Sequence, residues 1–208
     1  NAALRSIVRR DSGETYQEFL TKLAHASGIA TPTRQDLAKL DRKRDKKGSN
    51  DDWTHPHDPD ARITKMKDGR THLAHKAEHV VDLDDGAVIA VTIQPADRGD
   101  TDSGVETVLT ALDELDDVQP AGPDDDREIV ADKGYHSTDR VNDWDAIGLR
   151  TYISEPNRGR RRWQRQPAMR EAVYRNRRRI RGARGQRLLR RRGEYLERPT
   201  GHLSETGA

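Results

Sequence analysis

Two acidic residues, Asp132 and Glu197, stand where a carboxylate could bind a metal ion. Asp132 closes the apolar run 128–131 and is followed at once by Lys-Gly-Tyr, a turn signal that puts its carboxylate where a strand meets solvent. Glu197 lies 65 residues later, at the end of a segment crowded with arginine. Carboxylate oxygens suit Mg²⁺ and arginine suits phosphate, so the layout indicates the handling of polyphosphate with metal ions. For Asp132 alone, the plainer interpretation is a solvated strand end.

The elements that would position Asp132 form an α/β pattern. Residues 72–81 and 87–93 are rich in β-formers and are joined by a Leu-Asp-Asp-Gly turn signal, which predicts a hairpin. Residues 128–131 and 149–153 are two further strand candidates. Apolar residues recur at helical spacing over 105–115. A hairpin, a helix and two more strands predict a mixed sheet flanked by helices.

The segments on either side of this sheet are read as helical. Helices are predicted over 14–26 and 33–40, with Thr33 as an N-cap, and a solvated loop follows over 41–52. From Ala168 onward an arginine-covered helix has only a narrow apolar stripe, and Pro199 ends it, kinks it or starts a new helix. The predicted regions are 1–69 (helical, charged insertion), 70–155 (sheet core) and 156–208 (Arg-rich helical segment).

Composition narrows the class of protein. Of the 208 residues 32% are hydrophobic and 36% charged, and the mean hydropathy is −1.06, which leaves little material for a core. The absence of cysteine excludes disulfides and thiolate metal sites. No apolar run approaches the roughly 18 residues that span a bilayer, and no signal peptide opens the chain. These features predict a cytoplasmic protein with no membrane partner.

Charge is divided unequally along the chain. Residues 1–149 carry 20 basic against 31 acidic residues, whereas 150–208 carry 18 arginines, no lysine and 5 acidic residues. Such a basic block indicates a nucleic-acid partner through phosphate contacts without sequence preference. If about six arginines engage, affinity for duplex DNA falls roughly a thousandfold between 50 and 200 mM salt. The alternative is a structural helix whose arginines pair with the acidic part of the chain. The candidate DNA-binding residues are Lys133, Arg158, Arg160, Arg161, Arg162, Arg177, Arg178, Arg179, Arg181, Arg184, Arg190, Arg191 and Arg198.

Two other functions compete with metal-assisted phosphate chemistry. One is a non-catalytic nucleic-acid binder that uses residues 158–192 as a basic arm. The other is a zinc-binding protein, because His72, His75 and His79 lie near a second group in sequence, His55, His57, Asp58 and Asp60. If 72–81 is a strand, His75 and His79 share one face while His72 points to the other.

Four segments resemble the DDE transposases of bacterial insertion sequences. They are 57–62 (His-Asp-Pro-Asp-Ala-Arg), 71–82 (beginning Thr-His-Leu-Ala-His), 130–135 (Val-Ala-Asp-Lys-Gly-Tyr) and 194–199 (Glu-Tyr-Leu-Glu-Arg-Pro). The resemblance covers nearly the whole chain. It implies an RNase H-like fold in which carboxylates bind two Mg²⁺ or Mn²⁺ ions, and DNA transposition by cutting and joining strands.

Carried over residue by residue, Asp132 resembles the family's second catalytic Asp and Glu197 its catalytic Glu. Thr200 stands where the family usually has Phe. The family's first catalytic Asp belongs to an opening strand that this chain is expected to lack, so the chain resembles a transposase truncated at both ends and inactive alone. The resemblance further implies transposon ends and target DNA as partners, a possible homodimer in an intact protein, and a nucleoid location.

Overall fold

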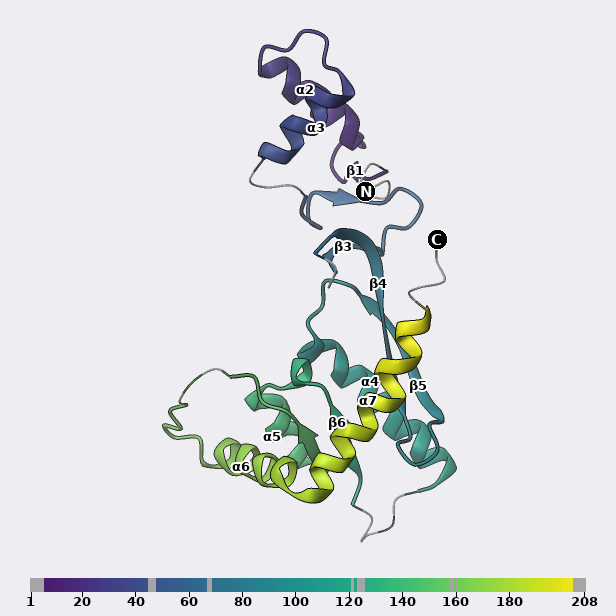
Figure 1. The fold of residues 1–208 in the computed structure, drawn as a ribbon, viewed down its shortest axis with the longest axis vertical. Coiled ribbons are helices and arrows are strands. Elements are labelled where there is room, and N and C mark those ends of the chain that lie inside the picture. Colours follow the sequence, from purple (N-terminus) through teal and green to yellow (C-terminus); the bar gives the residue numbers. More distant parts are fainter. Residues whose placement is uncertain are drawn as a thin grey trace. The chain divides into compact units, whose positions relative to one another are not determined.

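The computed structural model describes residues 6–44, 48–66, 69–120, 122, 126–157, 159 and 161–203, and side chains up to residue 196 (Figure 1). Two compact units are distinguished, Asn1–Ala77 with Ile93–Arg98 and Glu78–Thr92 with Gly99–Ala208. The boundary between them passes through two strands of one sheet. Both units combine helices with strands, so the fold is mixed α/β, in keeping with an RNase H-like transposase domain.

The first unit holds two short helices, α2 (Tyr16–Ala26) and α3 (Arg34–Lys43). Both begin with a capping box, in which a threonine hydroxyl and an acid three residues later satisfy each other's backbone amides. Thr33 is the N-cap of α3, as predicted. Strands β1 (Val8–Arg9) and β2 (Trp53–Thr54) pair beside them, and the small core is built from Ile7, Tyr16, Leu20 and Trp53.

A three-stranded sheet contains the predicted hairpin. Its order is β3 (Arg62–Lys65), β4 (Thr71–Val81) and β5 (Val88–Pro95). The turn between β4 and β5 closes where predicted, with Gly86 at φ +82° and its amide donating to the Asp82 carbonyl at 2.9 Å. Strand β3 was not predicted, and the first 69 residues therefore contain strands as well as helices.

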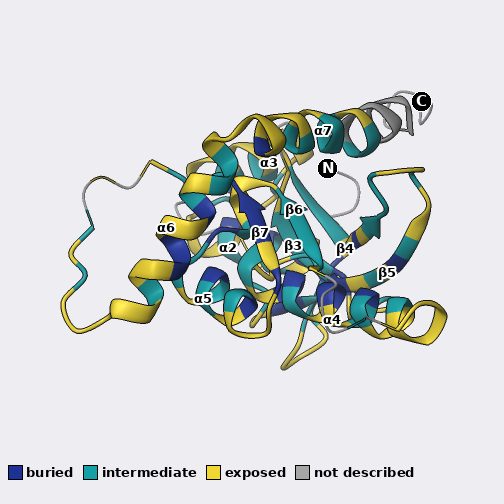
Figure 2. Ribbon diagram, turned by 90° about the horizontal axis from the view of Figure 1, so that it is seen from below, coloured by how far each residue is buried: buried dark blue, intermediate teal, exposed yellow. Residues whose placement is uncertain are grey.

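The second unit is built around a parallel pair of strands. β6 (Glu128–Ala131) and β7 (Arg150–Ile153) pair in register, Val130 opposite Tyr152, and are linked by η1 (Lys133–Tyr135) and α5 (Thr138–Ala146). α4 (Asp100–Val118) covers them, and the cores contain Val108, Trp144 and Ile153 in one cluster and Val141 with Val173 in another. Figure 2 shows β7 as a largely buried strand.

The Arg-rich segment forms two helices rather than one. α6 (Pro167–Arg181) ends at Gly182, and α7 (Ala183–Leu203) runs on through Pro199, so that proline does not end the helix. Buried Asn176 holds α6 on the end of β7, because its amide accepts from the Ile153 N–H at 3.0 Å and donates to the Ile153 carbonyl at 2.9 Å. The predicted mixed sheet is divided, since β6–β7 and β3–β4–β5 are separate sheets in the described residues.

The turn between α6 and α7 predicts a sharp difference between two glycines. A Cβ added at buried Gly185 would overlap the Arg179 carbonyl, whereas one at Gly182 would sit 3.5 Å from the same oxygen, an ordinary contact. Gly185→Ala is therefore expected to destabilise the chain by about 1–3 kcal/mol, as overpacking does. The matched control Gly182→Ala is expected to change the free energy of unfolding by less than about 0.5 kcal/mol in urea titration. Equal effects of the two would contradict the geometry.

Candidate active site

Asp132 lies at the tip of β6 and caps the turn that follows. Its Oδ1 accepts the Lys133 backbone N–H at 2.7 Å, and its side chain is exposed. Within the described residues Oδ2 has no hydrogen-bond partner. One carboxylate oxygen is therefore oriented by the backbone while the other faces solvent, where a hard cation or a phosphate-bound metal could approach it.

Tyr135 holds this turn against the rest of the unit. Its hydroxyl donates to Glu78 Oε1 at 3.1 Å, and its ring packs on α4 at Gly104, where an added Cβ would come within 2.6 Å of the ring. Burial, and then the negative charge of Glu78, raise the pKa of Tyr135, so the phenol stays protonated and remains a donor. The three-residue turn after Asp132 thereby has a fixed position.

Glu78 is a buried acid on β4 whose carboxylate accepts from three hydroxyls. Besides Tyr135, Ser103 donates to Oε1 and Thr107 to Oε2, both at 2.7 Å. These bonds satisfy a charge that burial would otherwise disfavour. Because both oxygens already accept hydrogen bonds, Glu78 is a structural acid that joins β4, α4 and the turn, and not a vacant metal ligand.

Asp100 is a further acid that the fold brings to the turn. It is the first residue of α4, where negative charge is favoured, and a Cβ added at Gly134 would overlap its carboxylate oxygen. Sequence reasoning passed over Asp100 and Glu78. Asp100 could have been found from the Gly-Asp-Thr-Asp run, which is a helix-start signal. Glu78 could have been found because it is an acid inside a β-rich run.

α7 passes alongside β6 (Figure 1). Near its start Arg184 donates to Glu128, the first residue of β6, at 2.6 Å. Eight residues later, the positive charge of Arg192 partly opposes the rise in the pKa of Tyr135 that burial and Glu78 cause. Eight helical residues and four strand residues each advance about 12–13 Å, so Arg192 is expected beside the turn at the other end of β6. Glu197 follows five residues further along α7, and its side chain lies outside the described residues.

Many of the predicted DNA-binding arginines are engaged within the protein. Arg179 contacts Asp145 at 3.3 Å and the Thr151 carbonyl at 3.3 Å, while Arg191 contacts Asp84 at 2.9 Å. Arg178 pairs with Glu171 at 3.3 Å. Most of these partners come from the acidic part of the chain, so a share of its charge imbalance is cancelled internally.

Glu155 is shared between two arginines. Arg177 makes a bidentate contact with it, at 2.6 and 2.9 Å, and Arg161 lies 2.9 Å away. The hydrogen bond from Arg177 is the main cause that lowers the pKa of Glu155, with burial opposing it and Arg161 adding to it. The carboxylate therefore stays ionised, and the segment after β7 is tied to α6.

The remaining predicted contacts fall into two groups. Arg162, Arg181 and Arg190 make no ion pair within the described part of the chain, and the same holds for Lys133 and for exposed Arg187, which was not predicted. Arg158 and Arg160 lie outside the described residues, as does the side chain of Arg198. Their roles stay predictions.

The histidines do not form a metal centre in the described residues. His75 Nε2 is 3.0 Å from Asp58 Oδ2, but no three of the described His, Asp and Glu side chains gather as a metal site would require. The zinc hypothesis therefore gains no support from the described residues.

Comparison with known families identifies the class of protein. The family described as "Transposase DDE domain" matches residues 9–200. This chain belongs to that family, whose members act in DNA transposition. Comparisons with curated proteins and with solved structures gave no significant match. No helix in the described residues is long and apolar enough to cross a membrane.

The Glu78 cluster predicts a stability difference between two conservative changes. Glu78→Gln places an NH₂ among hydroxyl donors and leaves part of the cluster unsatisfied, at an expected cost of about 2–3 kcal/mol. Tyr135→Phe removes one donor and retains the ring against Gly104, at an expected cost of about 1 kcal/mol. Urea unfolding followed by far-UV circular dichroism measures both. A Glu78→Gln chain as stable as the native one would show that the carboxylate is not needed.

Proposed function

We propose that this chain supplies two of the carboxylates with which a transposase of an insertion sequence cuts and joins DNA strands. The observation that carries the proposal is the position of Asp132: it ends β6 with an outward oxygen, in a chain that belongs to the transposase DDE domain family. Glu197, on the helix that passes the same strand, is the second carboxylate of the proposal. Both act on DNA, the substrate that the family implies.

The residues fit a divalent cation in part. Asp132 offers a hard oxygen ligand oriented by the Lys133 N–H, and Mg²⁺ or Mn²⁺ needs one or two such ligands besides phosphate oxygens and water. When bound, such ions would supply Lewis-acid stabilisation to the oxygens that gain charge at the phosphate. Asp132 and Glu197 would hold them, while the ammonium of Lys133, next to the tip of β6, would attract the DNA phosphate.

We further propose that the chain is inactive on its own. The proposal rests on two carboxylates, and a pair of carboxylates binds metal more weakly than a complete set. Intact activity would involve transposon ends, target DNA and a second copy of the protein in the cytoplasm, next to the nucleoid. The alternative of a non-catalytic DNA binder is separated from this proposal by metal binding.

Metal binding by two acidic residues is the test of this function. Mn²⁺ titration followed by electron paramagnetic resonance is expected to show binding that weakens at least tenfold in both Asp132→Asn and Glu197→Gln, because each removes a charged oxygen ligand. Asp139→Asn, on α5 beyond the turn, is the matched control and is expected to bind as the native chain does. If neither variant changes Mn²⁺ affinity, the shared metal site is refuted and the DNA-binder alternative is favoured.

DNA binding would use the arginines that the fold leaves exposed. Arg187 and Arg190 lie three residues apart on α7 and Arg181 ends α6, and all three are exposed and without an ion pair in the described residues. Arg179, by contrast, is mostly buried against Asp145 and β7. Three or four engaged arginines would lower duplex affinity roughly 40- to 150-fold between 50 and 200 mM salt, a weaker dependence than six arginines give.

Exposed and engaged arginines are expected to respond differently to the same substitution. In Arg187→Gln/Arg190→Gln the slope of log affinity against log salt, measured on an arbitrary duplex, should shrink by about 1.8, since each phosphate contact contributes about 0.9. Arg179→Gln should leave the slope unchanged and lower the stability by about 1–3 kcal/mol, because Asp145 loses a partner. A flat salt plot for the native chain would end the DNA-binding proposal.

A further inference from the structure

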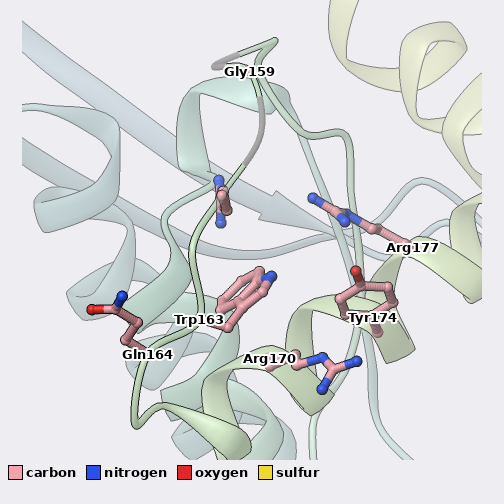
Figure 3. A pocket seen from close by; sticks show the side chains of 7 residues that line it. Gly159, Trp163, Gln164, Arg170, Tyr174 and Arg177 are labelled. Atoms are coloured by element: carbon pink, nitrogen blue, oxygen red, sulfur yellow. The ribbon is translucent and has the colours of Figure 1, made fainter.

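A cavity of about 440 Å³ lies between the segment after β7 and α6 (Figure 3). Its volume is in the range of small-molecule sites. Its wall contains the side chains of Trp163, Tyr174 and Arg170. Arg161, Gln164 and Arg177 also line the cavity. The described contacts of Asp132 do not involve these residues, so the cavity is separate from the candidate active site.

Two aromatic rings, tilted by 56° to each other, line the cavity with apolar surface. Trp163 and Tyr174 have ring centroids 6.3 Å apart, and Figure 3 shows both rings at the cavity. Trp163 packs on the buried cluster of Val141, Ala172 and Val173, which fixes its position. Tyr174 is 38% exposed, and the guanidiniums of Arg170 and Arg177 lie 5.5 and 5.1 Å from its ring centroid.

The cavity is also cationic. Arg161 and Arg177 share the single charge of Glu155, which leaves one positive charge in excess. Arg170 lies 5.5 Å from the Tyr174 ring centroid and has no acidic partner within the described residues. Exposed aromatic surface next to unpaired positive charge suits a ligand that is both planar and anionic.

The backbone that carries Trp163 and Gln164 is held in an uncommon conformation. Arg165, the next residue, has φ +57°, and it is the one non-glycine residue in the described chain with a positive φ. Such left-handed positions cost of order 1 kcal/mol and gather at ligand-binding sites.

We propose that this cavity binds a single unstacked nucleotide of a DNA strand, with its base on Tyr174 and Trp163 and its phosphate at Arg170. The proposal rests on the proposed function in taking DNA as the substrate. Stacking of bases on aromatic side chains, combined with arginine at the backbone, is the general chemistry of single-strand binding. A free nucleotide carries the same base and phosphate, so the test includes it.

The test compares a single-stranded thymidine octanucleotide with an abasic strand of the same length, binding to the full chain. The native chain should bind the thymidine strand about five- to a hundredfold more tightly, the range of one base stacked on an aromatic ring. Tyr174→Ala should bring that ratio close to one, and Tyr174→Phe should retain it. Arg170→Gln, an exposed change, should weaken both strands equally and leave the ratio intact. Thymidine monophosphate as competitor distinguishes a free nucleotide from a strand.

A second measurement locates the base. Photocrosslinking of a 5-iodouracil strand should attach to the peptides that carry Trp163 and Tyr174. A ratio near one in the native chain, a ratio that Tyr174→Ala leaves unchanged, or crosslinks elsewhere would overturn the proposal. Arg187→Gln/Arg190→Gln separates the two proposals: it should lower duplex affinity and leave the base-dependent ratio untouched. Duplex binding without a base-dependent ratio would contradict nucleotide binding in the cavity and would leave the proposal for the α7 arginines standing.

Discussion

The second unit depends on one buried carboxylate. Glu78 reaches from β4 to Ser103 and Thr107 on α4 and to Tyr135 in the turn after Asp132, and three hydroxyl donors make its burial tolerable. A hydrophobic residue at this position would fill the space but would not select one rotamer for each donor. The cluster therefore specifies where the hairpin, the long helix and the turn meet, and the geometry around Asp132 follows from it.

The arginine-rich segment contains two groups of arginines that its composition alone does not separate. Arg177, Arg179 and Arg184 bind acids of the α/β core and keep α6 and α7 in place. Arg181, Arg187 and Arg190 remain exposed. Exposed ion pairs add little stability, generally under about 1 kcal/mol, but those that involve Glu155 and Asp145 are largely enclosed. Internal pairing thus accounts for the first group, and phosphate contacts stay a prediction for the second.

Much of the fold was accessible from the sequence because its signals were local. The hairpin over β4 and β5, the strand ending at Asp132 and the Thr33 cap each rest on adjacent residues whose chemistry is unambiguous. The family was accessible for a similar reason, since its motifs are short and specific. Helix α5 was missed because its apolar positions, Val141 and Trp144, are few and lie among acids.

The parts that sequence could not supply are those that join distant residues. Nothing adjacent to Glu78 indicates that Tyr135 will donate to it from 57 positions away. The cavity at Trp163 is similar, because the pairing of Trp163 with Tyr174 depends on where α6 lies. The break between α6 and α7 was weakly signalled, because glycines at 182, 185 and 193 all interrupt the arginine pattern while two of them are tolerated inside α7.

The amide of Asn176 has a mechanical consequence. By giving and accepting one hydrogen bond at Ile153, it copies the peptide group of a neighbouring strand, so α6 is coupled to β7 as another strand would be. β7 is in turn in register with β6, Ala131 opposite Ile153. A force applied to α6 by a bound DNA strand would pass through two sets of backbone hydrogen bonds to the tip of β6. Helix α6 and the end of β6 next to Asp132 are therefore connected mechanically, through the side-chain amide of Asn176 and the backbone hydrogen bonds between β7 and β6.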